Sequence, residues 1–322
     1  MTPVNARSGV QAKLDSMTQA AATLAKLPGR LPAFRAPLPL ARRRVTLCRR
    51  LRQRAVACAI VTLLLAGCAT VPETGRTQFM MVRAAAELDM GLTAFAQIKE
   101  ELTLVEEGPE YEMLQRVGHR VAAEAEPLLA RRGIEDLEWE FLLADDDALN
   151  AFVLPGGKIV FYSGIMPLLE DEAGVAAVMG HEVGHLVGRH AGERISQHVL
   201  VAMSMTAAQV ALARRDPQHR DQIMAALGLG ALVGVMLPYS RLHESEADEI
   251  GLLLMARAGY DPREAVRVWE RMAAEQETRP PEFLSTHPDP ERRAAHLREI
   301  MPRALEEYRA INGEDVAAAI RH

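Results

Sequence analysis

The residues most able to do chemistry in this sequence are two histidines and a glutamate within five positions, His181-Glu182-Val183-Gly184-His185. Residues i and i+4 of a helix lie about 40° apart around its axis, so both imidazoles would project from one face toward a shared cation. Neutral imidazole suits zinc, and two histidines leave room for a third protein ligand and a water. Glu182 can reach that water, so the motif indicates zinc-assisted hydrolysis with Glu182 as general base.

A third metal ligand must come from another segment, and the sequence offers several candidates. Glu244 and Asp248 are four positions apart on an expected helix, so one carboxylate can bind metal while the other orients a ligand histidine. His243 competes with Glu244, but its side chain should point about 100° away. On a continuing helix His190 lies about 180° from His181, so we expect it at the surface or in contact with a ligand, not on the metal.

These residues must be positioned by a largely helical chain. Apolar residues make up 49% of the sequence and aromatic residues only 4%, which favours a mainly α protein with a small β-sheet, an α+β fold. The periodicity predicts helices over about 83–98, 110–132, 167–213, 221–237, 241–258, 262–276 and 289–312. Strands are expected over 137–144, 151–154 and 158–162, the last two on either side of Pro155-Gly156-Gly157.

Two apolar stretches, 199–213 and 223–237, need a separate interpretation. Each has 15 residues, or about 22 Å as helix, which falls short of the ~30 Å hydrocarbon core of a bilayer. We therefore expect either buried core or a membrane-facing hairpin.

Charge is divided unevenly along the chain. Residues 1–67 contain 12 Lys/Arg against Asp15, a net charge of +11, whereas residues 68–322 carry a net charge of −17. An acidic body argues against nucleic acid as a partner, because that binding needs a basic stripe. The basic head is followed by an apolar run, 55–65, which is typical of a secretory signal and too short to span a bilayer.

The signal ends in Leu65-Ala66-Gly67-Cys68. This ending resembles the lipobox of bacterial lipoproteins, which implies cleavage before Cys68, lipidation of that cysteine and, because Ala69 follows, sorting to the outer membrane. Cys48 and Cys58 would leave with the signal, so the mature chain would have no thiol for a disulfide, a nucleophile or a zinc ligand. A mitochondrial transit peptide is the alternative, since the head is Arg-rich and nearly free of acids.

Several motifs together resemble a known peptidase family. His181–His185, followed about 60 residues later by Glu244-Ser245-Glu246-Ala247-Asp248, resembles the HtpX/BepA/LoiP-like gluzincins, which are related to the CAAX prenyl endopeptidase. The further matching segments are Thr74-Gly75-Arg76 with Gln78, Asn150–Gly157, and Thr286-His287-Pro288 with Arg293. The resemblance implies a zincin-type metallopeptidase domain with an active-site helix and a short edge strand, closest to the compact LoiP-like lipoproteins. The expected organisation is an N-terminal extension and lipoprotein signal peptide (1–67), a tether (68–82), the zinc metallopeptidase domain (83–312) and a C-terminal tail (313–322).

The same resemblance implies a role for each site residue. His181, His185 and Glu244 would bind one zinc ion per chain, Glu182 would be the general base, and Asp248 would orient a ligand histidine. His287 and Arg293 would approach the metal or the oxyanion. His287 has two further interpretations: it could simply cap a helix, or it could be a reversible fourth ligand that holds the enzyme latent.

The edge strand, with Asn150, Ala151, Phe152 and Val153, could take an extended substrate by strand addition, or it could be only a structural hairpin. We therefore expect a zinc metalloendopeptidase that is lipid-anchored at the periplasmic face of the outer membrane. Its substrates would be unfolded, misfolded or misassembled envelope proteins, and nothing in the sequence indicates its oligomeric state. The alternatives are a chaperone-like or latent lipoprotein binding module of the same fold, and a mitochondrial quality-control peptidase of the same family.

Overall fold

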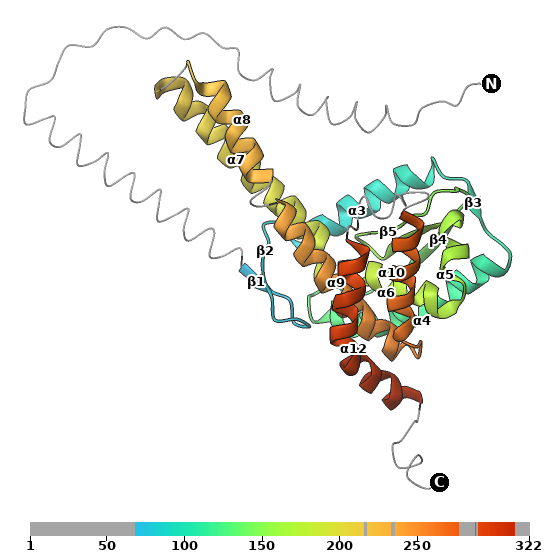
Figure 1. Ribbon diagram of the computed structural model, residues 1–322. Coiled ribbons are helices and arrows are strands. Elements are labelled where there is room, and N and C mark those ends of the chain that lie inside the picture. Colours follow the sequence, from blue (N-terminus) through green and yellow to red (C-terminus); the bar gives the residue numbers. More distant parts are fainter. Residues whose placement is uncertain (1–67, 216–217, 233–235, 277–286, 288, 313–322) are drawn as a thin grey trace, which may run out of the picture. The chain divides into compact units, whose positions relative to one another are not determined.

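The computed structural model describes residues 68–215, 218–232, 236–276, 287 and 289–312 (Figure 1). The predicted signal region, 1–67, and the predicted tail, 313–322, lie outside the described residues, as do Thr286 and Pro288. The domain boundaries drawn from the sequence therefore stay predictions.

A four-stranded sheet forms one layer of the fold. Its strand order is β3 (Leu104–Val105), β4 (Glu140–Ala144), β6 (Lys158–Tyr162) and β5 (Ala151–Leu154). β4 pairs with β6 in parallel, and the other two pairings are antiparallel. β5 and β6 begin and end where the sequence predicts, whereas β4 begins three residues later than the expected strand. β5 is an edge strand of this sheet.

The helix that carries the histidine pair, α6 (Glu172–Gly188), lies at the centre of the fold. It begins after Asp171, whose Oδ1 accepts hydrogen bonds from the backbone N–H groups of Ala173 and Gly174 at 2.9 and 3.0 Å. Every residue from Gly174 to Gly188 is buried, as expected for a helix that is apolar on all sides. The site residues of this helix, His181, Glu182 and His185, are therefore largely shielded from bulk water.

The prediction of a single helix over 167–213 is wrong. The structure divides that stretch into α5 (Met166–Leu169), α6 and α7 (His190–Arg215). Two residues with left-handed backbone separate them, Glu170 with φ 68° and Arg189 with φ 53°. A positive φ cannot continue a right-handed helix, so the chain changes direction at both positions.

Helix α9 (Leu237–Arg257) packs against α6 at unusually close range. A Cβ atom on Gly180 would lie 2.6 Å from the carbonyl oxygen of Gly251, and one on Gly184 would lie 2.6 Å from that of Ala247. The two backbones therefore touch where the site residues lie. Helices α4 (Pro109–Ala130), α10 (Arg263–Gln276) and α12 (Pro290–Asn312) complete the core around this pair (Figure 1).

The segment expected as a tether is part of this packed structure. β1 (Cys68–Thr70) pairs with β2 (Thr77–Phe79), and Val71 between them is fully buried. The backbone N–H of Met81 donates to Ser196 Oγ of α7 at 2.9 Å. With α3 (Ala84–Lys99) packed on the sheet, the described residues confirm the expected mainly helical α+β class.

The two apolar stretches form a helical hairpin of α7 with α8 (Arg220–Ala231), which lie side by side (Figure 1). From His198 to Leu232 no described residue is buried. The interpretation of these stretches as buried core is therefore wrong, and the membrane-facing alternative remains.

Candidate metal centre

Four donor side chains from three segments converge at one point. His181 and His185 come from α6, Glu244 from α9, and His287 from the chain just before α12. One ligand atom from each lies within 4.8 Å of all the others, and all four residues are buried. The sequence-predicted ligands are thus brought together, and His287 lies with them.

The spacing of the donor atoms fits a metal ion. His181 Nε2 lies 3.0 Å from His185 Nε2 and 3.1 Å from His287 Nδ1, while the Glu244 carboxylate lies 3.4 and 3.5 Å from the first two nitrogens. Ligands about 2.05 Å from a tetrahedral zinc lie about 3.3 Å apart, close to these values. The residues present therefore fit zinc, and His181, His185 and Glu244 would hold it.

The charge state of these donors also suits a cation. Burial holds the pKa of His185 well below its usual value, so its imidazole is neutral at physiological pH. The pKa of Glu244 is also well below its usual value, because the surrounding imidazoles of His185, His181 and His287 outweigh the opposing effect of burial. A neutral imidazole beside an ionised carboxylate is the form in which both bind metal.

Asp248 and Arg293 support the ligands from behind. His181 Nδ1 lies 3.1 Å from Asp248 Oδ1, which leaves Nε2 to face the other donors. Arg293 Nε donates to Asp248 Oδ2 at 2.9 Å, and its Nη1 lies 3.3 Å from Glu244 Oε2. The Arg293 guanidinium also stacks over Trp269, 3.5 Å from the ring centroid. Arg293 thus holds two carboxylates in place.

His190 contacts a proposed ligand, which is one of the two positions expected for it, although the helix does not continue through Arg189 as the sequence predicts. Because the chain turns at Arg189, His190 Nδ1 comes within 2.7 Å of His185 Nδ1, and its Nε2 lies 2.9 Å from Glu246 Oε2. Burial lowers the pKa of His190 to about 4, so the ring is neutral. If His190 carries its proton on Nε2 and donates it to Glu246, then Nδ1 accepts from His185. That assignment leaves His185 Nε2 as the free lone pair for metal.

A buried ionic cluster adjoins the contacts that run from His185 through His190 to Glu246. The sequence did not predict this cluster. Arg76 donates to Glu193 at 2.7 Å and to Glu246 at 2.6 Å, and His243 Nε2 lies 3.0 Å from Glu193 Oε2. His243 is therefore turned away from the metal, as its helical position predicts. The only earlier signal for the cluster was the match of Thr74-Gly75-Arg76 to a family segment, because contacts between residues more than 100 positions apart cannot be read from spacing.

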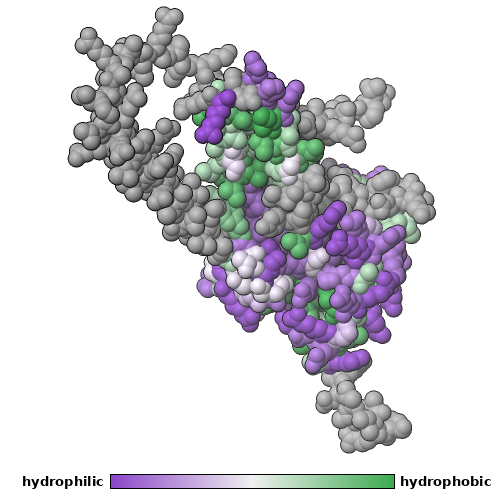
Figure 2. Space-filling model, turned by 60° about the vertical axis from the view of Figure 1, so that its left-hand side comes forward, coloured by the Kyte–Doolittle hydropathy of each residue, from purple (hydrophilic) through white to green (hydrophobic). Residues whose placement is uncertain are grey.

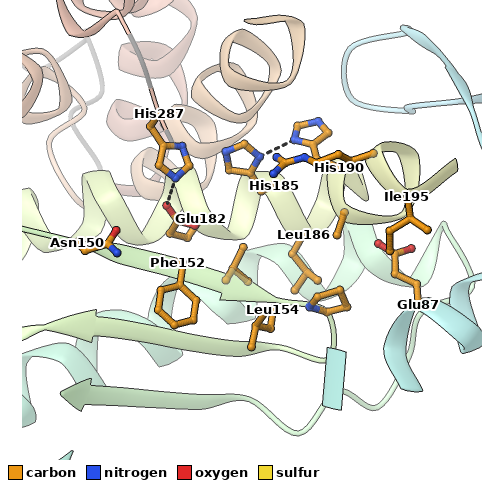
Figure 3. A pocket seen from close by; sticks show the side chains of 14 residues that line it. Glu87, Asn150, Phe152, Leu154, Glu182, His185, Leu186, His190, Ile195 and His287 are labelled. Carbon is orange, nitrogen blue, oxygen red and sulfur yellow. Dashed lines mark hydrogen bonds and ion pairs between the residues drawn. The ribbon is translucent and has the colours of Figure 1, made fainter. Parts of the chain in front are cut away.

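Glu182 lies beside the metal donors on α6. Its Oε1 is buried and accepts no hydrogen bond from the residues that the structure describes, while His287 Nε2 lies 3.5 Å away (Figure 3). Burial raises the pKa of Glu182, against the opposing effect of the nearby imidazoles. A carboxylate with a raised pKa, one oxygen of which accepts no hydrogen bond from the described residues, is suited to accept a proton.

A cleft of about 410 Å³ opens on these residues. Glu182, His185 and Leu186 of α6 line one side, and Phe152 and Leu154 from the region of edge strand β5 line the other (Figure 3). Asn150, Val153 and His287 also line the cleft, but Ala151, which is fully buried, and Arg293 do not. Most of the cleft surface is apolar, so it suits extended polypeptide with apolar side chains.

Comparisons with known proteins agree with this geometry. A model of peptidase family M48 matches residues 111–301. The chain is 36% identical over 239 residues to the mitochondrial metalloendopeptidase OMA1 of Schizosaccharomyces pombe, covering 73% of this chain and 66% of the relative. It is 31% identical over 269 residues to the protein of that name in Saccharomyces cerevisiae, covering 77% and 75%. It is 29% identical over 237 residues to the beta-barrel assembly-enhancing protease of Escherichia coli K12, covering 71% and 46%.

Proposed function

Because the chain belongs to peptidase family M48, we propose that it is a membrane-anchored zinc metalloendopeptidase that cleaves unfolded or misassembled proteins, with Glu182 as general base. The family assignment confirms the expected resemblance to HtpX/BepA-like gluzincins, the metallopeptidase class and the zinc dependence. The matched region spans 66% of the S. pombe relative and 46% of the E. coli relative. The substrates of the whole protein are therefore proposed from the geometry of the candidate metal centre and its cleft.

The observation that supports the role of Glu182 is the placement of its buried Oε1 at the cleft beside the metal donors, where it accepts no hydrogen bond from the described residues. Bound zinc would supply Lewis acidity toward the peptide carbonyl and toward water. Glu182 would accept the proton of the attacking water and deliver it to the leaving amine. His181, His185 and Glu244 would hold the ion, while Asp248 and His190 keep the two imidazoles in the tautomers that bind it.

The edge strand indicates how substrate would lie. An extended peptide could add to β5 through main-chain hydrogen bonds, with Asn150, Phe152 and Val153 along the cleft. Main-chain recognition tolerates many sequences, and the cleft has few charged groups apart from the catalytic ones. We therefore propose broad cleavage of unfolded or misassembled chains instead of one recognition sequence.

For location, we propose lipidation of Cys68 and attachment to the periplasmic face of the outer membrane, with envelope proteins as substrates. The lipobox-like Leu65-Ala66-Gly67-Cys68 supports this placement, as does the similarity to an E. coli protease named for β-barrel assembly. A second candidate is a mitochondrial quality-control peptidase, which is favoured by the similarity to the mitochondrial metalloendopeptidases of the two yeasts. Incorporation of labelled palmitate that is lost in Cys68→Ala supports the bacterial placement, and a chain processed without acylation supports the mitochondrial one.

The proteolytic role is tested with an unfolded substrate such as reduced casein. Glu182→Gln should lower the cleavage rate by about 10²–10⁴-fold, while the matched control Glu270→Gln, at a half-exposed ion pair, should cleave like wild type. If Glu182→Gln cleaves normally, the proposed mechanism is wrong. If it fails to cleave but fully replaces the wild-type gene in cells, the chaperone-like function is favoured over proteolysis.

A further inference from the structure

The α7–α8 hairpin exposes apolar side chains that the metal centre does not use. Large apolar residues of the hairpin with more than a third of their surface exposed are Val199, Met203, Val210, Leu227, Leu229 and Leu232. Helix α8 has no buried residue among those described. Figure 2 shows hydrophobic residues gathered on this part of the protein, with hydrophilic residues at its end. Exposure on this scale is unfavourable in water and marks an interaction surface.

Charged residues flank two long uncharged stretches in the sequence of this region, as expected for segments that enter the apolar core of a bilayer. Between Arg194 and Arg214 there is no Asp, Glu, Lys or Arg, and the same holds between Asp221 and Arg241. The first of these uncharged stretches, 195–213, lies within α7 and has 19 residues, about 28 Å as helix, close to the ~30 Å hydrocarbon core. The segment His190–Ala213 is long and apolar enough to cross a membrane, and only 11% of its most apolar window is buried, unlike a core helix.

The directions of the exposed side chains favour lipid over a protein partner. Leu227 and Leu229 lie about 200° apart around α8, and both are exposed. One partner surface could cover only one of them, whereas lipid surrounds the hairpin. Two hydroxyls on α7 are already satisfied: Ser204 donates to the Leu200 carbonyl at 2.8 Å and Thr206 to the Ala202 carbonyl at 2.9 Å. Such self-contained hydrogen bonds suit a medium without water.

The charged turn decides how deeply the hairpin can enter. Arg215 ends α7 and Arg220 begins α8, and each would cost roughly 2.5–3.5 kcal/mol at the centre of the bilayer. A half-inserted hairpin would place them there, whereas a fully inserted one lets them reach the far headgroups. The base of the hairpin lies next to β1, because Cys68 pairs with Phe79, whose backbone N–H donates to Glu193 of α7.

We propose that the α7–α8 hairpin inserts into the lipid bilayer across its apolar core, with Arg215 and Arg220 at the opposite headgroups. The base of the hairpin and Cys68 then lie at the same membrane surface. The metal centre is held close to that surface, because the helix that begins at His190, a neighbour of His185, becomes the first membrane arm.

Flotation with vesicles of phosphatidylethanolamine and phosphatidylglycerol tests this proposal. The full-length chain is used in a Cys68→Ala background, so that no acyl chain can bind lipid. The test variant adds Met203→Glu and Leu229→Glu, at side chains 59% and 63% exposed. The control adds Met90→Glu and Ile311→Glu, at exposed apolar residues of α3 and α12. Cleavage of soluble casein reports that each variant is folded.

The proposal predicts that the parent and the control float with the vesicles, and that the vesicle-bound fraction of the test variant falls at least tenfold with casein cleavage unchanged. A bimane label at position 229 should also be quenched by lipid-borne bromine. The proposal is wrong if the parent stays in the aqueous fraction, or if both variants float equally. It is also wrong if the hairpin substitutions only dissociate an oligomer formed without lipid, which would identify a second copy as the partner.

Discussion

Two proposed ligand histidines at the metal centre each have one ring nitrogen that faces a supporting side chain. Asp248 faces Nδ1 of His181, and His190 faces Nδ1 of His185, so both Nε2 atoms point toward Glu244. The i, i+4 spacing of the motif predicted the shared face, and the Glu244–Asp248 spacing predicted one ligand and one supporting carboxylate. The contact of His190 was not predictable in the same way, because it depends on the left-handed backbone of Arg189. That conformation is rare for arginine and leaves no trace in the periodicity.

Asp248→Asn should weaken zinc binding. The amide cannot accept the His181 proton as a charged group, and it leaves Arg293 without its main ionic partner. We expect a loss of about 10–100-fold in zinc affinity, measured by competition with a chelator of known affinity. Glu249→Gln, on the same helix but in a surface ion pair with Arg303, is the matched control. Equal affinities for the two variants would contradict the assigned role of Asp248.

His287→Ala tests whether this residue acts at the metal or only at the start of a helix. Its Nδ1 lies 2.7 Å from Glu244 Oε2 and its Nε2 lies 3.5 Å from Glu182 Oε1, so we expect its removal to change both zinc affinity and casein cleavage severalfold. His119→Ala, at an exposed histidine on α4, should change neither quantity. If His287→Ala has wild-type zinc affinity and wild-type casein cleavage, His287 has only a structural role.

At the scale of elements, the site depends on how closely α6 and α9 approach. The sequence predicted helical structure at both places, although it joined α6 to its neighbours, and it predicted the two strands beside the cleft, because long apolar periods and turn residues are local signals. It could not predict that Gly180 and Gly184 allow backbone contact with α9, since glycine inside a helix has several possible causes. Nor could it predict the cluster of Arg76, Glu193 and Glu246, whose members lie far apart in sequence.

Gly180→Ala should destabilise the fold and loosen the site. The added methyl group would lie 2.6 Å from the Gly251 carbonyl oxygen, so α6 and α9 must separate and move Glu244 away from the histidines. We expect a loss of about 1–3 kcal/mol in the free energy of unfolding, measured by denaturant titration, together with weaker zinc binding. Gly230→Ala is the matched control, because a Cβ there meets nothing within 4 Å, and it should not destabilise the protein. Comparable losses in both variants would contradict the close-packing explanation.

The buried cluster at Glu193 should make stability depend on pH. The pKa of Glu193 is well below its usual value of 4.5, because hydrogen bonds from His243 and Arg76 outweigh the opposing effect of burial. The folded state therefore gains stability from the ionised carboxylate above about pH 4.5, and loses it as the pH falls toward the folded pKa. Glu193→Gln should unfold more easily at neutral pH, by about 2 kcal/mol, but lose less further stability on acidification.

Thermal unfolding of the metal-free proteins, followed from neutral pH down to about pH 3, measures this difference. Chelator in every sample separates the effect of Glu193 from acid release of metal. Parallel curves for wild type and Glu193→Gln would show that Glu193 is not the source of the pH dependence.

In the molecule as a whole, the proposed catalytic residues and the proposed membrane-attachment features lie in different parts of the chain. The proposed catalytic groups lie on α6, α9 and the segment before α12, whereas the lipobox-like Cys68 and the α7–α8 hairpin are the features proposed to attach the protein to a membrane. The sequence predicted an apolar pair of segments at 199–237 but could not decide between core and surface. Burial decides it, because a hairpin with no buried residue from 198 to 232 among those described has no core to contribute. The M48 assignment supports the zinc chemistry. The cellular compartment is a separate question, which depends on how the chain is attached to a membrane.

Metal removal and restoration with an unfolded substrate tests the central claim most directly. Purified protein treated with chelator should lose casein cleavage, and activity should return in proportion to added zinc until one equivalent per chain is bound. Glu182→Gln should bind the same single equivalent yet remain inactive, because the metal donors are intact and only the proton acceptor is gone. Cleavage that persists in the metal-free protein, or a Glu182→Gln variant that recovers with zinc as wild type does, would contradict the account.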